Sequence, residues 1–177
     1  MTKEELNEIL AYEKQLYYKS LKIMGGVIPV EIRERDILYK FVYMLRMTEY
    51  HLSNQHRIRS LIYKMRLCRM QNKYALHIQP FTCGKGLSIG HIGPIIINDQ
   101  CRIGENLRVH VGVNIGANGG KAPVIGNGVY IGPGAKIFGD IRIADGCSIG
   151  ANAVVNKSCN IQGATLVGIP AVEKIKN

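Results

Sequence analysis

Two histidines, His91 and His110, lie where this sequence most readily places hydroxyl chemistry. An imidazole has an unperturbed pKa of about 6.5, so it can remove a hydroxyl proton near neutral pH as a general base. His91 lies in the segment Gly90-His91-Ile92-Gly93-Pro94, beside a break in an otherwise regular repeat. His110 follows a repeat position where this sequence elsewhere has a small residue. It is either a partner of the catalytic base or a side chain that packs at a corner of the coil. His77 is a weaker candidate, and an ordinary surface role is the alternative for each histidine.

The repeat around these histidines returns an isoleucine or valine at every sixth position. The marked positions are Ile97, Ile103, Val109, Ile115, Ile125, Ile131, Ile137, Ile143, Ile149, Val155 and Ile161. Such a hexapeptide period is typical of a β-helix in which each unit is one short strand and one corner, and three units close a coil. Stacked coils lie about 4.8 Å apart, so residues 75–170 predict a prism of about five coils. A β-sandwich is disfavoured because period-two alternation is missing.

The repeat breaks twice, and we expect a functional site at these irregularities. From Ile89 to Ile97 the step is eight residues instead of six, and His91 lies within it. The second break is residues 117–123, a loop between Ile115 and Ile125. Its Gly119-Gly120-Lys121 is not a phosphate loop, because the spaced first glycine and the following Ser or Thr are missing.

The first 75 residues predict three helices. Thr2 and Glu5 form a capping box for a helix that runs to Met24 and stops at Gly25-Gly26. A second helix opens at Pro29 and ends near Ser53-Asn54. Its apolar face is predicted to contain Ile37, Phe41, Leu45, Thr48 and Leu52.

The third helix, residues 55–73, is basic and amphipathic. It contains six Lys and Arg and no acid, around an apolar line of Ile58, Leu61, Ile62 and Met65. One interpretation is a helix packed against the prism or a neighbouring subunit, with a solvated basic face. The other is peripheral attachment to a membrane surface.

We divide the chain into an α-helical N-terminal region, 1–75, and a β-helix domain, 76–177. Eighteen of the 20 glycines lie beyond residue 83, as expected where the chain turns a corner every six residues. Residues 163–177 leave the repeat at Gly168-Ile169-Pro170 and are predicted to fold back over the prism as a short strand or helix.

The net charge of +10 is shared by both regions and suits a polyanionic partner. A phosphorylated cofactor, nucleic acid and an acidic lipid surface all fit the charge alone. We expect neither a signal peptide nor a membrane span, because no basic start precedes an apolar run, and we infer a cytoplasmic protein.

The five cysteines predict neither a disulfide nor a zinc site. They contain no CxxC pair, and Cys101, Cys147 and Cys159 fall on small interior positions of the repeat. The pair His51 and His56 lies in the helical part, away from the coils, so we expect no metal.

The sequence resembles the left-handed β-helix acyltransferases, specifically the serine acetyltransferase branch and its relatives in polysaccharide biosynthesis. The resemblance covers residues 76–172. It is carried by residues 84–91, which resemble the segment leading to the catalytic histidine, and by residues 113–116, which resemble the strand before the loop. Residues 131–136, 149–155 and 167–171 resemble the cofactor-binding coils and the terminal signature.

This resemblance implies a mainly β fold, a left-handed parallel β-helix prism with a short helical N-terminus. It also implies acetyl-CoA as co-substrate and assembly as homotrimers, sometimes paired into hexamers, with no nucleic-acid partner. His91 would be the catalytic base, with His110 beside it. The cofactor-binding set it implies is Gly116, Gly132, Pro133, Lys136, Gly150, Ala151, Lys157 and Lys174.

The residues that differ from the family pattern are those expected to bind the acceptor substrate. Gly90 stands where serine acetyltransferases have an Asp, His77 falls near a second expected Asp, and Lys121-Ala122 replaces an Arg-His pair in a longer loop. We therefore expect an acetyl-CoA-dependent O-acetyltransferase acting on a sugar hydroxyl in capsular or exopolysaccharide biosynthesis. The alternatives are a serine O-acetyltransferase and a non-catalytic trimeric scaffold that binds a partner or membrane through its basic helices.

Overall fold

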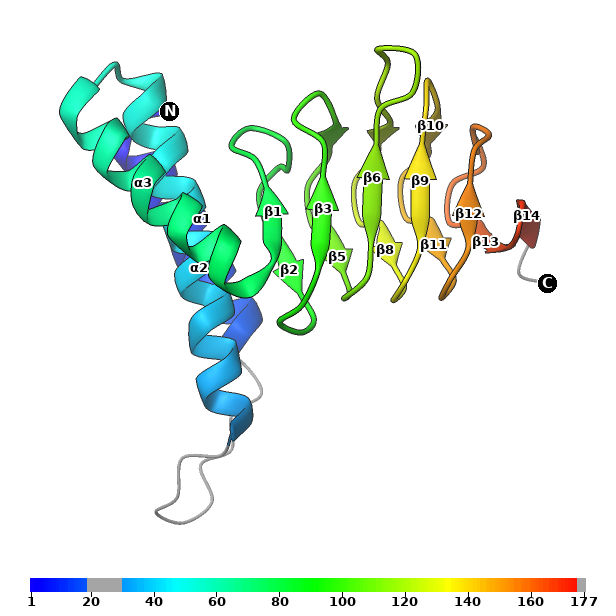
Figure 1. Cartoon of the computed structure of the whole chain (residues 1–177), viewed down its shortest axis with the longest axis horizontal. Coiled ribbons are helices and arrows are strands. Elements are labelled where there is room, and N and C mark those ends of the chain that lie inside the picture. Colours follow the sequence, from blue (N-terminus) through cyan, green and yellow to red (C-terminus); the bar gives the residue numbers. More distant parts are fainter. Residues whose placement is uncertain (19–29, 175–177) are drawn as a thin grey trace.

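The computed structural model describes residues 1–18 and 30–174. A layer of helices lies at one end, and a prism of short strands extends away from it (Figure 1). The helices are α1 (Lys3–Tyr18), α2 (Val30–Ser53) and α3 (Arg57–Tyr74). No helix among these described residues is long and apolar enough to cross a membrane.

The prism has three faces, each a sheet whose neighbouring parallel strands lie one coil apart in the sequence. The first face contains β1 (Leu76–Ile78), β3 (Ile95–Ile97), β6 (Asn114–Gly116), β9 (Lys136–Phe138) and β12 (Val154–Val155). The second contains β4 (Arg102–Ile103), β7 (Val124–Ile125) and β10 (Arg142–Ile143). The third contains β2 (Ser88–Ile89), β5 (Arg108–Val109), β8 (Tyr130–Ile131), β11 (Ser148–Ile149), β13 (Thr165–Gly168) and β14 (Ala171–Lys174). The predicted β-helix of about five coils is confirmed.

The interior of the prism is filled by the repeat, as predicted. Ten of the eleven marked residues, from Ile97 to Val155, are buried, and so are the small or apolar residues between them. Ile161 is the exception, at 43% exposed, so its assignment to the interior is wrong. The bridge between Ile143 and Cys159 puts Cys159 in register with the marked Ile143, so Cys159, which is buried, takes the interior position two residues before Ile161.

The helices close the first coil of the prism through a buried ion network. Arg46 of α2 contacts Glu13 of α1 at 2.8 Å and Glu49 at 2.9 Å, and all three side chains are buried. The guanidinium also donates to the Cys83 and Gly84 carbonyls. Burial opposes the charge of Arg46, but the Glu49 and Glu13 carboxylates outweigh it and raise its pKa. The network fixes α1 and α2 on the segment that leads to His91.

Several predictions for the helices are confirmed and one is wrong. Thr2 and Glu5 exchange the two hydrogen bonds of a capping box, at 2.8 and 3.1 Å. The predicted end of the first helix, its Gly25-Gly26 stop and the Pro29 start of the second lie outside the described residues. On the predicted apolar face of α2, Phe41, Leu45 and Thr48 are buried and Ile37 is half-buried. Leu52 is 38% exposed and comes at the last turn.

The apolar line of α3 does not pack against the prism. Ile58, Leu61, Ile62 and Met65 are all exposed, and the helix instead buries Leu67 and Gln71. Gln71 Nε2 donates to the Ile78 carbonyl at 2.9 Å, which ties this opposite side to the first strand. The prism therefore contacts α3 through Leu67 and the Gln71 amide, so of the alternatives left open by the sequence, packing of the apolar line against the prism is wrong.

The remaining details agree with the sequence. All five cysteines are free, and four of them are buried. The C-terminal segment folds back as a strand, because β14 pairs antiparallel with β13. The division into domains at residue 75 stays a prediction, since one buried cluster runs from the helices through the prism.

Candidate active site

One corner of the prism gathers the predicted catalytic residues, and we call it the histidine corner. It is formed by the connections from the third face to the first face, at residues 90–94, 110–113, 132–135 and 150–153. Strand register pairs Ile89 with Val109, Val109 with Ile131, and Ile131 with Ile149. The residue that follows each of these is Gly90, His110, Gly132 or Gly150, so these four stack in a column along the corner.

His91 lies at the end of this corner nearest the helices, and a carboxylate from α2 orients it. Its Nδ1 is 3.4 Å from Glu34 Oε2, and the imidazole side chain is 65% exposed. The other oxygen, Glu34 Oε1, accepts the Ile92 backbone N–H at 2.7 Å, so α2 holds the carboxylate against the segment that carries His91. A proton on Nδ1 shared with Glu34 leaves Nε2 as the basic nitrogen. This is the arrangement of a general base positioned by a third group.

His110 lies below His91 and is more enclosed. The two imidazole rings are 6.3 Å apart, and the His110 ring is 5.2 Å from Tyr130. Burial, with the nearby positive charge of Arg108 and the neighbouring His91, lowers the pKa of His110. Its Nε2 is buried without a hydrogen-bond partner in the described structure. His110 is therefore held neutral, and His91 is the nitrogen base that an acceptor can reach.

The glycines before His91 have a structural explanation. A Cβ on Gly90 would meet His110 Nδ1 at 2.6 Å, and one on Gly86 would meet Asn106 Oδ1 at 2.3 Å. The space that these glycines leave is thus filled by the protein. Gly90 is required because the His110 ring occupies the position of its missing side chain, and an Asp at residue 90 would displace that ring.

A small cavity lies between the helices and the third face, at the residues that precede His91. It has a volume of about 230 Å³, and its lining includes Ser88, Gly90, Arg35 and Arg108. Gly90 directly precedes His91, and Arg35 directly follows Glu34 in α2. Two guanidinium groups at one small cavity form a site suited to the carboxylate or phosphate of a small acceptor.

The predicted cofactor residues lie in three places. Gly132, Pro133, Gly150 and Ala151 lie together at the histidine corner. Packing accounts for the two glycines, because a Cβ on Gly132 would meet the Ala151 backbone at 2.9 Å and one on Gly150 would meet Val167 at 2.8 Å. Pro133 and Ala151 are exposed beside them.

The lysines of that set are more dispersed. Lys136 lies on the first face, where its Nζ donates to the Gly112 carbonyl at the histidine corner. Gly116 ends β6, and a Cβ there would make an ordinary contact with Asn114 Oδ1 at 3.7 Å. Lys157 follows β12, and Lys174 ends β14 on the third face. Lys157 and Lys174 are both exposed.

The other sequence candidates lie away from the histidine corner. His77 is in β1, on the outer side of the first face in register with Ile96. The loop of residues 117–123 is at the far edge of that face, where Lys121 forms an ion pair with Asp140 at 2.6 Å. Within the described residues, no group of three His, Cys, Asp or Glu could hold a metal ion.

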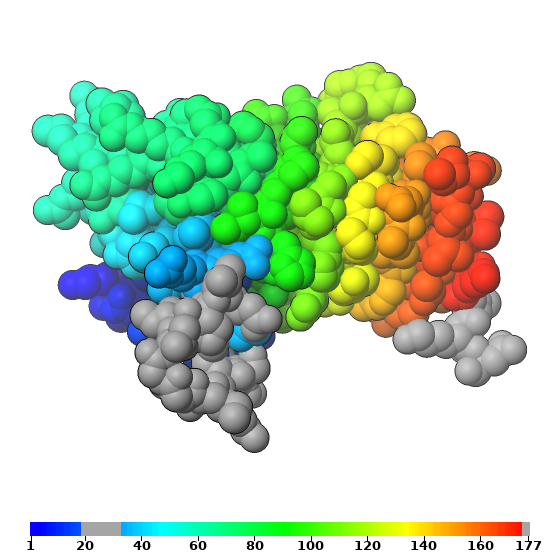
Figure 2. Space-filling model, turned by 60° about the horizontal axis from the view of Figure 1, so that its bottom comes forward, coloured from blue at the N-terminus to red at the C-terminus, as the bar shows by residue number. Residues whose placement is uncertain are grey.

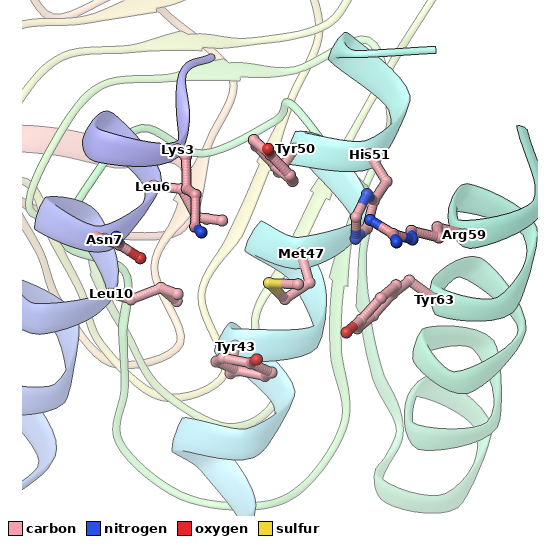
Figure 3. A pocket seen from close by; sticks show the side chains of 10 residues that line it. All are labelled: Lys3, Leu6, Asn7, Leu10, Tyr43, Met47, Tyr50, His51, Arg59 and Tyr63. Atoms are coloured by element: carbon pink, nitrogen blue, oxygen red, sulfur yellow. The ribbon is translucent and has the colours of Figure 1, made fainter. Parts of the chain in front are cut away.

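A larger pocket lies between the three helices (Figure 3) and has a volume of about 560 Å³. Its side chains include Lys3 from α1, Tyr43 and His51 from α2, and Arg59 from α3. His51 is buried, and its Nδ1 lies 3.0 Å from His56 Nδ1. Burial, with His56 and Arg59, lowers the pKa of His51. Among the described residues that line this pocket there is no carboxylate to orient the His51 imidazole as Glu34 orients His91.

Sequence reasoning missed Glu34. It lies 57 residues before His91, on a helix whose apolar pattern says nothing about which polar residue meets the prism. The only available signal was its place in the first turns of α2, and that signal does not single it out from Glu31 or Asp36.

Comparison with known proteins supports the fold class that this site occupies. Residues 122–157 match the family of bacterial transferase hexapeptides (six repeats). Soybean serine acetyltransferase apoenzyme superposes with a TM-score of 0.78 at 23% identity, covering 97% of this chain and 69% of that chain. Serine acetyltransferase from Brucella abortus strain S19 in complex with coenzyme A gives 0.77 at 22%, covering 97% and 68%. The chain is thus a parallel β-helix of hexapeptide repeats with three N-terminal helices.

Similarity in sequence is confined to part of the chain. Serine acetyltransferases from Staphylococcus aureus (strain COL) and Staphylococcus epidermidis are each 43% identical over 91 residues. That region is 49% of this chain and 42% of each relative, so the match spans less than half the length of the curated relatives.

Proposed function

We propose that this protein is a cytoplasmic O-acetyltransferase that transfers the acetyl group of acetyl-CoA to the hydroxyl of L-serine. The observation that carries the proposal is the His91–Glu34 pair at a break in a hexapeptide-repeat prism. The sequence alone pointed to a sugar, because three expected acceptor-binding residues are missing. The curated relatives are named serine acetyltransferases, and this supports L-serine instead.

In the proposed reaction His91 Nε2 removes the proton of the acceptor hydroxyl. The hydroxyl oxygen attacks the thioester carbonyl directly, the bond to sulfur breaks, and the imidazolium returns its proton to the leaving thiolate. Glu34 stabilises the imidazolium through Nδ1 and fixes its orientation. His110, held neutral, packs under Gly90 and shapes the floor of the site.

The cavity at Arg35 and Arg108 supports an acidic acceptor. A volume of about 230 Å³ accommodates a small molecule such as an amino acid far better than a sugar chain. The carboxylate of L-serine would lie toward the two guanidinium groups, which places its hydroxyl near His91. Both guanidinium groups, from α2 and β5, are cationic, so they would bind the carboxylate of the acceptor and would not replace the Asp that is absent at Gly90.

For acetyl-CoA we propose a binding track along the histidine corner. Pro133 and Ala151 would border the pantetheine, and Lys136, Lys157 or Lys174 would meet the phosphates. Gly132 and Gly150 keep the coils closely stacked beneath that track. We also propose a homotrimer, because His91 and the corner are open on one side and a neighbouring prism would complete the site.

An acceptor panel tests the proposal. Release of CoA thiol from acetyl-CoA is followed with L-serine, D-serine, L-alanine and a set of nucleotide sugars, and products are identified by mass. We expect saturable turnover with L-serine and none with L-alanine, which lacks the hydroxyl. Efficient turnover of a sugar with none of L-serine would establish the sugar reaction instead, and no thiol release with any acceptor would support the scaffold.

A further inference from the structure

The apolar side of α3 points away from the rest of the protein. Ile58 is 77% exposed, Leu61 59%, Ile62 38% and Met65 48%. Their spacing of three and four residues puts them on one stripe of the helix. At about 100° per residue this stripe lies opposite Leu67, which is buried. Figure 2 shows α3, in green-cyan, at the outer surface of the helical end.

Cations border this stripe on both edges. At the same angular step, Arg57 and Lys64 lie along one edge, and Arg59, Arg66 and Lys73 lie along the other. All five are exposed, and residues 55–73 contain no acid. An apolar stripe flanked by Lys and Arg is the arrangement of a helix that lies in the plane of a membrane interface.

We propose that α3 docks this protein on an anionic phospholipid surface. The four apolar side chains would enter the boundary between headgroups and acyl chains, and the cations on both edges would meet the lipid phosphates. Long Lys and Arg stems allow this, because they cover apolar surface while their charged ends stay at the headgroup level.

The charge of α3 favours an anionic lipid surface over a second copy of the chain and over a nucleic acid. A second copy packed face to face would bring the same cationic borders together, since each copy has the same six basic residues and no acid in this segment. A nucleic acid would neutralise the cations but would leave the apolar stripe in water. An anionic lipid surface satisfies both the stripe and its borders.

Vesicle sedimentation tests the proposal with the full chain. Vesicles of about three parts phosphatidylcholine to one part phosphatidylserine are compared with pure phosphatidylcholine. The Ile58→Asn/Leu61→Asn double variant removes the centre of the stripe, and Lys64→Gln/Arg66→Gln removes one cation from each edge. Val172→Asn is the matched control, because Val172 is also 59% exposed but lies in β14 at the far end of the prism (Figure 1). Circular dichroism confirms that each variant is folded.

We expect binding to the anionic vesicles that weakens with salt. The apolar double variant should bind at least about tenfold more weakly, and the cation double variant about tenfold more weakly, while Val172→Asn binds like the wild type. Absence of vesicle binding would overturn the proposal. So would unchanged binding of Ile58→Asn/Leu61→Asn, which would mean that charge alone attracts the protein. Sedimentation velocity compares the oligomeric state of the wild type and of Ile58→Asn/Leu61→Asn. A smaller assembly in the variant would show that α3 is a contact between copies instead.

Discussion

Glu34→Gln should slow acetyl transfer more than its distance from the acceptor suggests. The Oε2 to Nδ1 separation of 3.4 Å corresponds to an attraction for the imidazolium of about 1 kcal/mol in water and about 5 kcal/mol at an effective dielectric constant near 20. His91 is 65% exposed and Glu34 30%, so the value for this pair lies near the water limit. Loss of about 1–2 kcal/mol corresponds to about 5- to 30-fold in kcat.

The glutamine adds a second effect on the tautomer. Its carbonyl can still accept the Ile92 N–H, so the fold is kept, but its NH₂ would donate to Nδ1 and place the imidazole proton on Nε2. We therefore expect a loss of about 10- to 100-fold in kcat for Glu34→Gln and a smaller loss for Glu34→Ala, which leaves the tautomer free.

Steady-state kinetics with L-serine and acetyl-CoA measure both variants, with Glu8→Gln, an exposed glutamate on α1, as the control. The KM for acetyl-CoA should hardly change in either variant, because Glu34 acts on the imidazole of His91 and not on the cofactor. Wild-type kcat in Glu34→Gln, or a greater loss in Glu34→Ala than in Glu34→Gln, would refute this reasoning.

Three further predictions concern stability and CoA binding. His110→Phe should be at least as stable as the wild type near neutral pH, because it removes a buried nitrogen without a partner. Burial lowers the pKa of His110, so as the pH falls below about 6.5 the histidine of the unfolded chain is protonated before that of the folded protein. The unfolding free energy of the wild type should therefore fall more steeply with decreasing pH than that of His110→Phe. Denaturant titrations that give the same pH dependence for both proteins would contradict this. Arg46→Met should cost about 3–5 kcal/mol of unfolding free energy, because Glu13 and Glu49 stay buried without their partner, whereas a loss below about 1 kcal/mol would mean that the network is not closed in solution. Lys157→Glu or Lys174→Glu should raise the KM for acetyl-CoA more than it lowers kcat, since the phosphates are remote from the reacting carbonyl; calorimetry showing unchanged CoA affinity in both variants would remove these lysines from the proposed track.

The repeat made most of the fold predictable. A β-branched residue at every sixth position predicts which side chains fill the interior of a β-helix. Each of these marked residues from Ile97 to Val155 is buried, as the pattern requires. Ile161 shows the limit, because a count of six cannot show that this coil is shorter and that Cys159 pairs with Ile143 instead. The position of His91 at a break was likewise visible in the sequence, since a departure from the period is a local property.

Contacts between the helices and the prism were not predictable in the same way. Glu34, Arg46 and Gln71 each make a polar contact across a large sequence separation or between elements, and no periodicity selects the partner. For α3 the apolar line suggested a packed face, yet the prism takes Leu67 and the Gln71 amide instead. Gly90 was visible in the sequence only as a departure from the family's Asp, and the His110 ring against it, which explains the glycine, was not predictable.

The central claim, that His91 is the base of an acetyl transfer, is tested most directly by comparing kcat for His91→Ala and His110→Ala with L-serine and acetyl-CoA. A positioned general base contributes about 10²- to 10⁴-fold, so His91→Ala should lose about that factor while its CoA affinity and assembly stay unchanged. His110→Ala should lose only about tenfold, since it has no orienting carboxylate and does not reach the acceptor. Loss of turnover in His110→Ala with most of it retained in His91→Ala, both proteins being folded, would contradict the account and assign the base to the other coil.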